Sequence, residues 1–374
     1  MKHLERMLKV AACAAVLVMS HLDVGAQTLA ITQPGPTNAG RNDLIVLPSG
    51  LPFLVTQESG VVRAVTCADA VCTSVTSSNA VANLTASRLR VALGADGLPV
   101  ISISILNNGL RFVKCQNLAC SLSSTSILEP GNLGTTDHSL VIPPDGRPVL
   151  AYFDGTAGDL KYVRCGDTAC VSGNQFSILD SAGSVGRAPA MSLVGGLPQI
   201  AYNVDGVSLR LALCTTLDCT SATFKALAAE NASHIAAMTA RDGSALVAYM
   251  ADTTSTDSLK IAKCSNALCA TVAVTTIDQL PGTSLGIGVR ITAGRDGLPV
   301  LSYLDATAGS IKLARCTRAD CTNSTLTTVQ APTPSLLSNG AANGLAISAA
   351  GTPVLAYSQG GKLTIHSCNT RSCQ

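Results

Sequence analysis

The sequence predicts an all-β fold, a seven-bladed β-propeller with four antiparallel strands in each blade. Two observations carry this prediction. The first is an internal repeat with a period of about 50 residues, which is the size of a propeller blade. The second is the pattern within one repeat, where four short apolar segments alternate with Gly or Asp-Gly turns. A third observation, at the two ends of the chain, predicts that the ring closes.

The clearest repeat begins at Asp145 with Asp-Gly-Arg-Pro-Val-Leu-Ala-Tyr and ends at Cys165, with Cys170 following after four residues. The segment from Asp296 to Cys321 is nearly the same. Within the first of these repeats the apolar pattern predicts strands over 139–142, 149–153, 160–165 and 176–179. A turn glycine recurs in all seven copies, and we expect a positive φ at each: Gly50, Gly97, Gly146, Gly196, Gly243, Gly297 and Gly351.

The two ends of the chain complement each other. Only Gln374 follows the last cysteine, so the last repeat lacks its fourth strand. The segment Thr28 to Thr32, followed by Gln-Pro-Gly, resembles the fourth-strand segment Thr125 to Leu128, followed by Glu-Pro-Gly. We therefore expect the N-terminal strand to complete the last blade.

The first 26 residues have the three regions of a secretory signal peptide. Basic residues come first, an apolar stretch runs from Val10 to Val18, and Val24-Gly-Ala precedes Gln27. We expect cleavage after Ala26, which leaves residues 27–374 as a single propeller domain. No later stretch is apolar for long enough to span a membrane. The sequence thus predicts a protein that is secreted, periplasmic or held at the cell surface.

Seven Cys-x4-Cys pairs mark the ends of the repeats. In an exported protein this spacing favours local disulfides over metal sites, because pairs on different blades lie too far apart to share one ion. We expect no metal and no cofactor. The predicted bridges join Cys67 to Cys72, Cys115 to Cys120, Cys165 to Cys170, Cys214 to Cys219, Cys264 to Cys269, Cys316 to Cys321 and Cys368 to Cys373.

Basic residues also recur four positions before the first cysteine of six repeats, as at Lys161 and Lys312. In the better copies this position faces the tyrosine of the second strand, Tyr152 or Tyr303. The recurrence favours an architectural role, with the basic head bound to a polar partner.

A polar ring is the candidate ligand site. Aligned on the turn glycines, several mostly cationic residues come at or near the start of the innermost strand, next to the central channel. Convergent Arg and His groups could hold a carboxylate or sulfate. The alternative is that they only satisfy backbone carbonyls and acidic neighbours between blades. The ring comprises Arg41, Arg88, Asp137, His138, Arg187, His234, Arg290 and Asn343.

The recurring Asp-Gly-x-Pro-Val-x-x-Tyr and Leu-Lys-x-x-x-Cys-x4-Cys pattern resembles that of repeat proteins exported by bacteria. More loosely, it is similar to sialidase-like and lectin-like propellers. This resemblance implies the fold and an extracytoplasmic setting. It implies no catalytic residue, because the Ser-x-Asp-x-Gly-x-Thr-Trp box of sialidases is missing from a chain without tryptophan.

Composition and motifs together favour a binding protein. The formal net charge of +2 gives no electrostatic basis for binding nucleic acid or a membrane surface. We expect a non-catalytic binding or scaffold protein that recognises a glycan, a cell-envelope polymer or a protein at the channel mouth. The first alternative is a carbohydrate-active hydrolase or lyase, although no pair of carboxylates stands apart from the repeat. The second is a module whose rim docks another protein.

Overall fold

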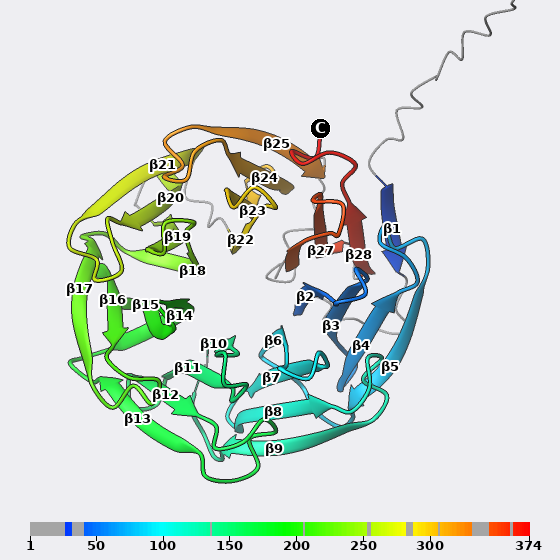
Figure 1. Cartoon of the computed structure of the whole chain (residues 1–374), viewed down its shortest axis with the longest axis horizontal. Coiled ribbons are helices and arrows are strands. Elements are labelled where there is room, and N and C mark those ends of the chain that lie inside the picture. The colour runs from blue at the N-terminus through cyan, green and yellow to red at the C-terminus, as the bar shows by residue number, and fades with distance from the viewer. Residues whose placement is uncertain are drawn as a thin grey trace, which may run out of the picture.

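The chain forms a closed ring of seven four-stranded sheets around a central channel (Figure 1). The computed structural model describes residues 27–31, 41–134, 137–204, 206–252, 256–281, 287–305, 307–330, 344–359 and 362–374. Within these residues every regular element is a β-strand. No described segment is a helix of the length and apolarity needed to cross a membrane. The predicted signal peptide, residues 1–26, lies outside the described residues.

Each blade is an antiparallel sheet whose strands follow one another from the channel outward. Blade 1 consists of β2 (Asn42–Val46), β3 (Pro52–Glu58), β4 (Val61–Cys67) and β5 (Val75–Val81). Blade 2 consists of β6 (Arg88–Leu93), β7 (Pro99–Ile105), β8 (Gly109–Cys115) and β9 (Ser123–Glu129). Blade 3 consists of β10 (His138–Val141), β11 (Val149–Asp154), β12 (Asp159–Arg164) and β13 (Gln175–Asp180).

The remaining blades repeat this order. Blade 4 consists of β14 (Val185–Val194), β15 (Leu197–Val204), β16 (Ser208–Cys214) and β17 (Ala222–Ala228), and blade 5 of β18 (Ala232–Thr239), β19 (Ala245–Ala251), β20 (Thr256–Cys264) and β21 (Val272–Pro281). Blade 6 consists of β22 (Ile287–Ala293), β23 (Pro299–Asp305), β24 (Ser310–Cys316) and β25 (Ser324–Gln330). Blade 7 consists of β26 (Gly344–Ile347), β27 (Pro353–Gln359) and β28 (Lys362–Ser367), and β1 (Gln27–Ile31) completes it.

The predicted closure of the ring is confirmed. β1 pairs antiparallel with β28, with Gln27 opposite Ser367 and Ile31 opposite Leu363. It thereby supplies the fourth strand of blade 7, beside β28, β27 and β26. The first and the last described strands thus meet in one sheet, so the last blade depends on β1.

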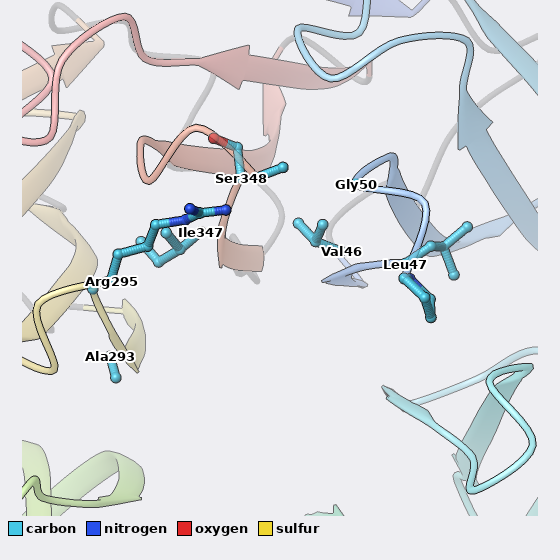
Figure 2. A pocket seen from close by; sticks show the side chains of 10 residues that line it. Val46, Leu47, Gly50, Ala293, Arg295, Ile347 and Ser348 are labelled. Atoms are coloured by element: carbon cyan, nitrogen blue, oxygen red, sulfur yellow. The ribbon is translucent and has the colours of Figure 1, made fainter.

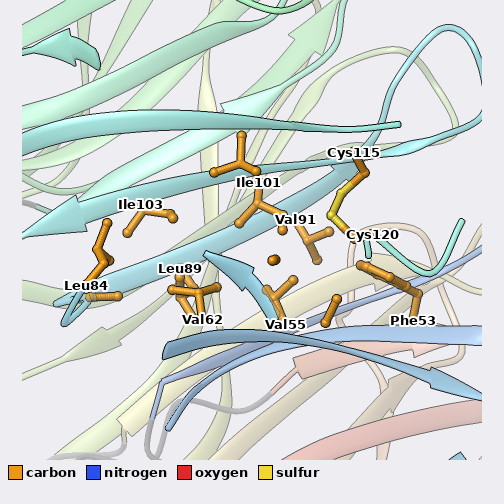
Figure 3. Packing of buried hydrophobic residues seen from close by; sticks show 14 of the residues in the cluster. Phe53, Val55, Val62, Leu84, Leu89, Val91, Ile101, Ile103, Cys115 and Cys120 are labelled. Atoms are coloured by element: carbon orange, nitrogen blue, oxygen red, sulfur yellow. A yellow bond between two sulfur atoms is a disulfide. The ribbon is translucent and has the colours of Figure 1, made fainter. Parts of the chain in front are cut away.

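Apolar side chains between the blades hold the ring together. All residues of the second strands β3, β7, β11, β19 and β23 are buried, because each sheet packs on both faces. Figure 3 shows one such cluster between blades 1 and 2, where Val55 and Val62 pack with Leu89 and Ile101. The core is therefore a set of contacts between neighbouring blades.

The turns follow the sequence prediction closely. The seven turn glycines have φ between +74° and +84°. In blade 3 a Cβ on Gly146 would lie 2.8 Å from the Cβ of Ala95, since the turns of neighbouring blades touch. All seven predicted disulfides are formed, with Cα–Cα distances of 4.6 to 4.9 Å. The second cysteine of each pair has a positive φ, which shows how tight these turns are.

The recurring basic residue belongs to a polar link between blades. In blade 4, Arg210 Nη1 and the Tyr202 hydroxyl both donate to Oδ2 of Asp180, from blade 3, at 2.8 and 2.6 Å. In blade 6, Tyr303 and Lys312 bind Asp278 of blade 5 in the same way. In these two blades the basic residue thus has the polar partner expected of it, an acid in the outer strand of the preceding blade.

Blade 2 replaces this link with an apolar contact. Ile103 stands at the tyrosine position and Val81 at the position of the acid, and both belong to the cluster between blades 1 and 2. Tyrosine and acid are therefore replaced together, as expected if the acid is buried only to satisfy its partners.

We predict that deleting residues 27–31 destabilises the whole domain. The deletion removes the β1–β28 ladder and exposes the edge of blade 7. The thermal midpoint should fall by about 5 °C or more, because a loss of 1 kcal/mol lowers the midpoint of a large domain by roughly 2–4 °C. Calorimetry or circular dichroism would measure this change. An unaltered midpoint would contradict closure by β1.

Candidate functional site

The first strands of the blades line the central channel and bring the candidate residues together. These strands are β2, β6, β10, β14, β18, β22 and β26 (Figure 1). They begin at one face of the ring, which also carries the loops between second and third strands and is here called the loop face. They end at the opposite face, the turn face, which carries the turn glycines and the disulfides. Several of the predicted ring residues lie where the channel opens on the loop face.

An ion pair joins blades 2 and 3 at this opening. Arg88 Nε lies 2.7 Å from Asp137 Oδ1, and both side chains are partly exposed, by 45% and 35%. Enclosure by the channel wall raises the pKa of Asp137, but the Arg88 and Arg90 guanidinium groups outweigh it, so this pKa lies below its usual value. Asp137 is therefore a carboxylate at neutral pH, within reach of water.

A second ion pair spans an intervening blade. Arg290 of blade 6 lies with its Nε 3.7 Å from Oδ1 of Asp43 in blade 1, and blade 7 stands between them. At this level blade 7 carries Gly344, which has no side chain to separate them. Enclosure, and then the charge of Arg90, lower the pKa of Arg290 to about 10. Arg290 remains protonated at neutral pH, although like charges surround it.

Arg90 forms no ion pair with a carboxylate among the described residues. Its Nη1 donates to the carbonyl of Leu89 at 2.9 Å, and no carboxylate of the described residues lies within 4 Å of it. Its charge nevertheless reaches Asp137, His138 and Arg290, because it lowers the pKa of each. A guanidinium in this position can accept an anion from outside the protein.

His234 faces the same opening from blade 5. Enclosure lowers its pKa to about 4; the Asp137 carboxylate opposes this shift, while Arg88 and Arg290 add to it. The imidazole is therefore neutral at physiological pH. Its backbone has φ +48°, at a bulge between Ser233 and Ala236 that interrupts the pairing of β18 with β19.

The other predicted ring residues serve the wall or lie elsewhere. Arg41 Nη1 donates to the Ala86 carbonyl of the next blade. His138 is fully buried, with Nε2 2.8 Å from Ser102 Oγ, so it offers no surface to a ligand. Arg187 lies with its guanidinium 5.2 Å from the ring centre of Phe153. Asn343 lies outside the described residues.

The structure adds two residues that the sequence reasoning missed, Arg90 and Asp43. Both stand seven positions before a turn glycine, as Arg290 does. On the second strand, the residue that pairs with Arg90 or Arg290 is a serine. The residue that pairs with this position in the other blades is valine or alanine. This shared offset was the signal that could have found them.

These side chains form what we call the channel cluster: Arg41, Asp43, Arg88, Arg90, Asp137, His234 and Arg290. Each influences the charge of another member. Four guanidinium groups face two carboxylates, and the imidazole is neutral. The excess of positive charge, in a narrow space that water reaches, suits a ligand bearing an anionic group.

A separate cavity opens at the turn face. It has a volume of about 360 Å³ and lies among the strand ends and turns of blades 6, 7 and 1, with Arg295, Ile347, Ser348, Val46 and Leu47 in its lining (Figure 2). The Arg295 stem covers Gly351, where a Cβ would lie 3.1 Å from Arg295 Cδ. This arginine therefore helps to pack neighbouring turns, and the cavity lies apart from the channel cluster.

The described residues offer no metal site of ordinary composition. His366 lies close to the sulfurs of Cys368 and Cys373, but these sulfurs form a disulfide and provide no thiolate.

Comparison with known proteins supports the fold alone. The sequence matches no family model, and no curated protein matches it significantly. The Cps50 (Swd1) β-propeller domain of Myceliophteria thermophila superposes with a TM-score of 0.56 at 10% identity, covering 91% of this chain and 99% of that one. The polysaccharide lyase Uly1 gives 0.57 at 9% identity, covering 89% and 91%. The SapL1 lectin, solved with alpha methyl fucoside, gives 0.51 at 10% identity, covering 79% and 96%.

Beside the channel cluster, blade 5 carries a carboxyl with an unusual pKa. Asp252 follows β19, and its Oδ1 accepts a hydrogen bond from Ser233 Oγ at 3.0 Å. The pKa of Asp252 is raised to about 6, mainly by burial. The hydrogen bond from Ser233 opposes this rise, and the nearby Asp257 carboxylate adds to it. Ionisation of Asp252 is therefore disfavoured in the folded protein.

We predict that Asp252→Asn stabilises the protein at neutral pH. Because the folded pKa lies above the unfolded one, the wild type loses this residue's stabilising contribution as the pH rises from about 4 to about 6. The variant should unfold at a higher temperature than the wild type at pH 7 to 8, and at nearly the same temperature at pH 4. A difference in unfolding temperature between variant and wild type that stays the same at all pH values would show that Asp252 ionises normally.

Proposed function

We propose that this chain is an exported binding propeller that holds an acidic carbohydrate at the loop-face opening of its channel. The observation that carries the proposal is the excess of guanidinium groups in the channel cluster. Arg88 and Arg290 already have carboxylate neighbours, whereas Arg90 has none within 4 Å among the described residues. A ligand carboxylate or sulfate would supply the missing charge, with charge-assisted hydrogen bonds.

Export is part of the proposal. Seven disulfides form and persist in an oxidising compartment, such as the periplasm or the cell exterior. Acidic polysaccharides of cell envelopes and of the surroundings are accessible there. The lectin among the similar folds supports a carbohydrate ligand only as an analogy of architecture.

Elimination by a lyase is the second candidate. A neutral imidazole could remove a proton from a uronic acid whose carboxylate is bound by a neighbouring arginine. His234 and Arg290 could have these two roles, because Arg290 acts on the charge of His234. However, a group with a pKa of about 4 is a weak base near neutral pH, which favours binding over turnover. Incubation with acidic polysaccharides, followed by ultraviolet absorbance of an unsaturated product, separates the two functions. Steady formation of product would establish the lyase.

We predict that Arg90→Gln weakens binding to acidic glycans on an array by about tenfold or more, which corresponds to about 1.4 kcal/mol. Glutamine keeps a polar side chain but removes the charge, and Arg90 leaves no ion-pair partner behind. Binding by the wild type should also weaken as salt is added.

The matched control is Arg318→Gln, at a disulfide turn where the arginine side chain is 68% exposed. This control should bind like the wild type. Equal binding by the wild type and Arg90→Gln, or a preference for neutral glycans, would contradict the proposal.

A further inference from the structure

The channel cluster contains acceptors as well as donors, and this mixture limits what it can bind. Asp137 and Asp43 stand among the arginines at this opening. A simple inorganic anion can pair with the arginines, but it has no donor groups for the carboxylate oxygens. Hydroxyl groups, by contrast, can donate hydrogen bonds to carboxylate oxygens. The cluster therefore suits a ligand that has an anionic group and hydroxyl groups close together.

His234 has a positive φ, a backbone conformation that residues other than glycine rarely adopt. Its φ of +48° lies in the left-handed region, at a bulge of β18. The corresponding bulge of β22, between Ile287 and Arg290, contains Gly288 with φ +69°. His234 and Gly288 both stand nine positions before a turn glycine. Glycine would occupy this conformation without strain, so the fold by itself does not require an imidazole here.

The imidazole is also available to a ligand. It is only partly buried, and neither ring nitrogen forms a hydrogen bond within the described part of the chain. It lies near the start of β18, the first strand of blade 5, at the loop face where the other first strands also begin. Asp137, Arg88 and Arg290 all act on its charge, in agreement with this position. A neutral imidazole has one donor and one acceptor nitrogen, so it can bind a hydroxyl group in either role.

We infer that the channel cluster recognises a uronic acid, with Arg90 and Arg290 holding its carboxylate and His234 binding a hydroxyl group of the same sugar. This inference rests on the proposed function and narrows it from acidic carbohydrates to one class. It also makes His234 a residue that determines specificity. Bulges next to binding sites commonly turn a side chain toward the ligand, and the bulge of β18 has this role.

The test uses three small probes in ligand-observed NMR titrations. Methyl glucuronoside has the carboxylate and the hydroxyl groups, cyclohexanecarboxylate has only the carboxylate, and methyl glucoside has only the hydroxyl groups. The proteins are the wild type, His234→Gly, His234→Asn and the matched control Ala188→Gly. Ala188 has φ +49° in the bulged first strand of blade 4, so its replacement relieves a similar backbone strain without removing a polar group.

The wild type should bind methyl glucuronoside about tenfold or more tightly than either other probe. In His234→Gly, the affinity for methyl glucuronoside should fall close to that for cyclohexanecarboxylate, while the melting temperature stays the same or rises. His234→Asn, which tolerates positive φ and keeps a donor and an acceptor, should retain part of the advantage. Ala188→Gly should bind all three probes like the wild type.

Three results would overturn the inference, and they can be told apart. Equal wild-type affinity for methyl glucuronoside and cyclohexanecarboxylate would show an anion site that ignores hydroxyl groups, which leaves the proposed function standing. Unchanged binding by His234→Gly, or a large fall in its melting temperature, would make His234 a structural residue. If neither methyl glucuronoside nor cyclohexanecarboxylate binds, and no acidic glycan on the array binds, the proposed function is overturned as well.

Discussion

The structure depends on one constraint, which is that every blade buries both faces of its sheet against its neighbours. The second strands show the consequence directly, because all residues of β7 and β23 are buried. Such positions accept apolar or small side chains and leave little room for polar chemistry. Side chains that can meet a ligand are thus confined to the loops, the rim and the ends of the innermost strands. This is why the channel cluster lies at the start of the first strands.

Several of the polar groups that enter the contacts between blades are paired. Asp180 binds both Tyr202 and Arg210, and blade 2 replaces tyrosine and acid together with Ile103 and Val81. In the channel cluster, Arg90 has no carboxylate partner within 4 Å among the described residues. An excess of positive charge at one opening of the ring is the kind of local inconsistency that functional sites show.

The fold was predictable because its signals are local and repeated. Turn glycines, cysteine spacing and strand length depend on neighbouring residues, and seven copies reinforce one another. Closure by β1 followed from the missing last strand. The site was harder to predict. Aligning the repeats on the turn glycines predicted a polar ring that includes Arg88, Asp137, His138 and His234. Strand alternation turns His138, the next residue after Asp137, into the wall against Ser102.

The bulges explain much of what the sequence could not provide. They shift the start of β14, β18 and β22 relative to the other first strands, and nothing in the apolar pattern reveals them. The ion pair from Arg290 to Asp43 was also hidden, because it joins blades 6 and 1 across blade 7. Such contacts depend on the closed ring, so they become visible only in three dimensions.

A crystal structure of the protein with an acidic oligosaccharide would show where this ligand binds. We expect the acidic group of the ligand within hydrogen-bond distance of the Arg90 and Arg290 guanidinium groups, at the loop-face opening of the channel. An oligosaccharide bound in the turn-face cavity beside Arg295, or on the outer strands with the channel cluster unaltered, would contradict this expectation.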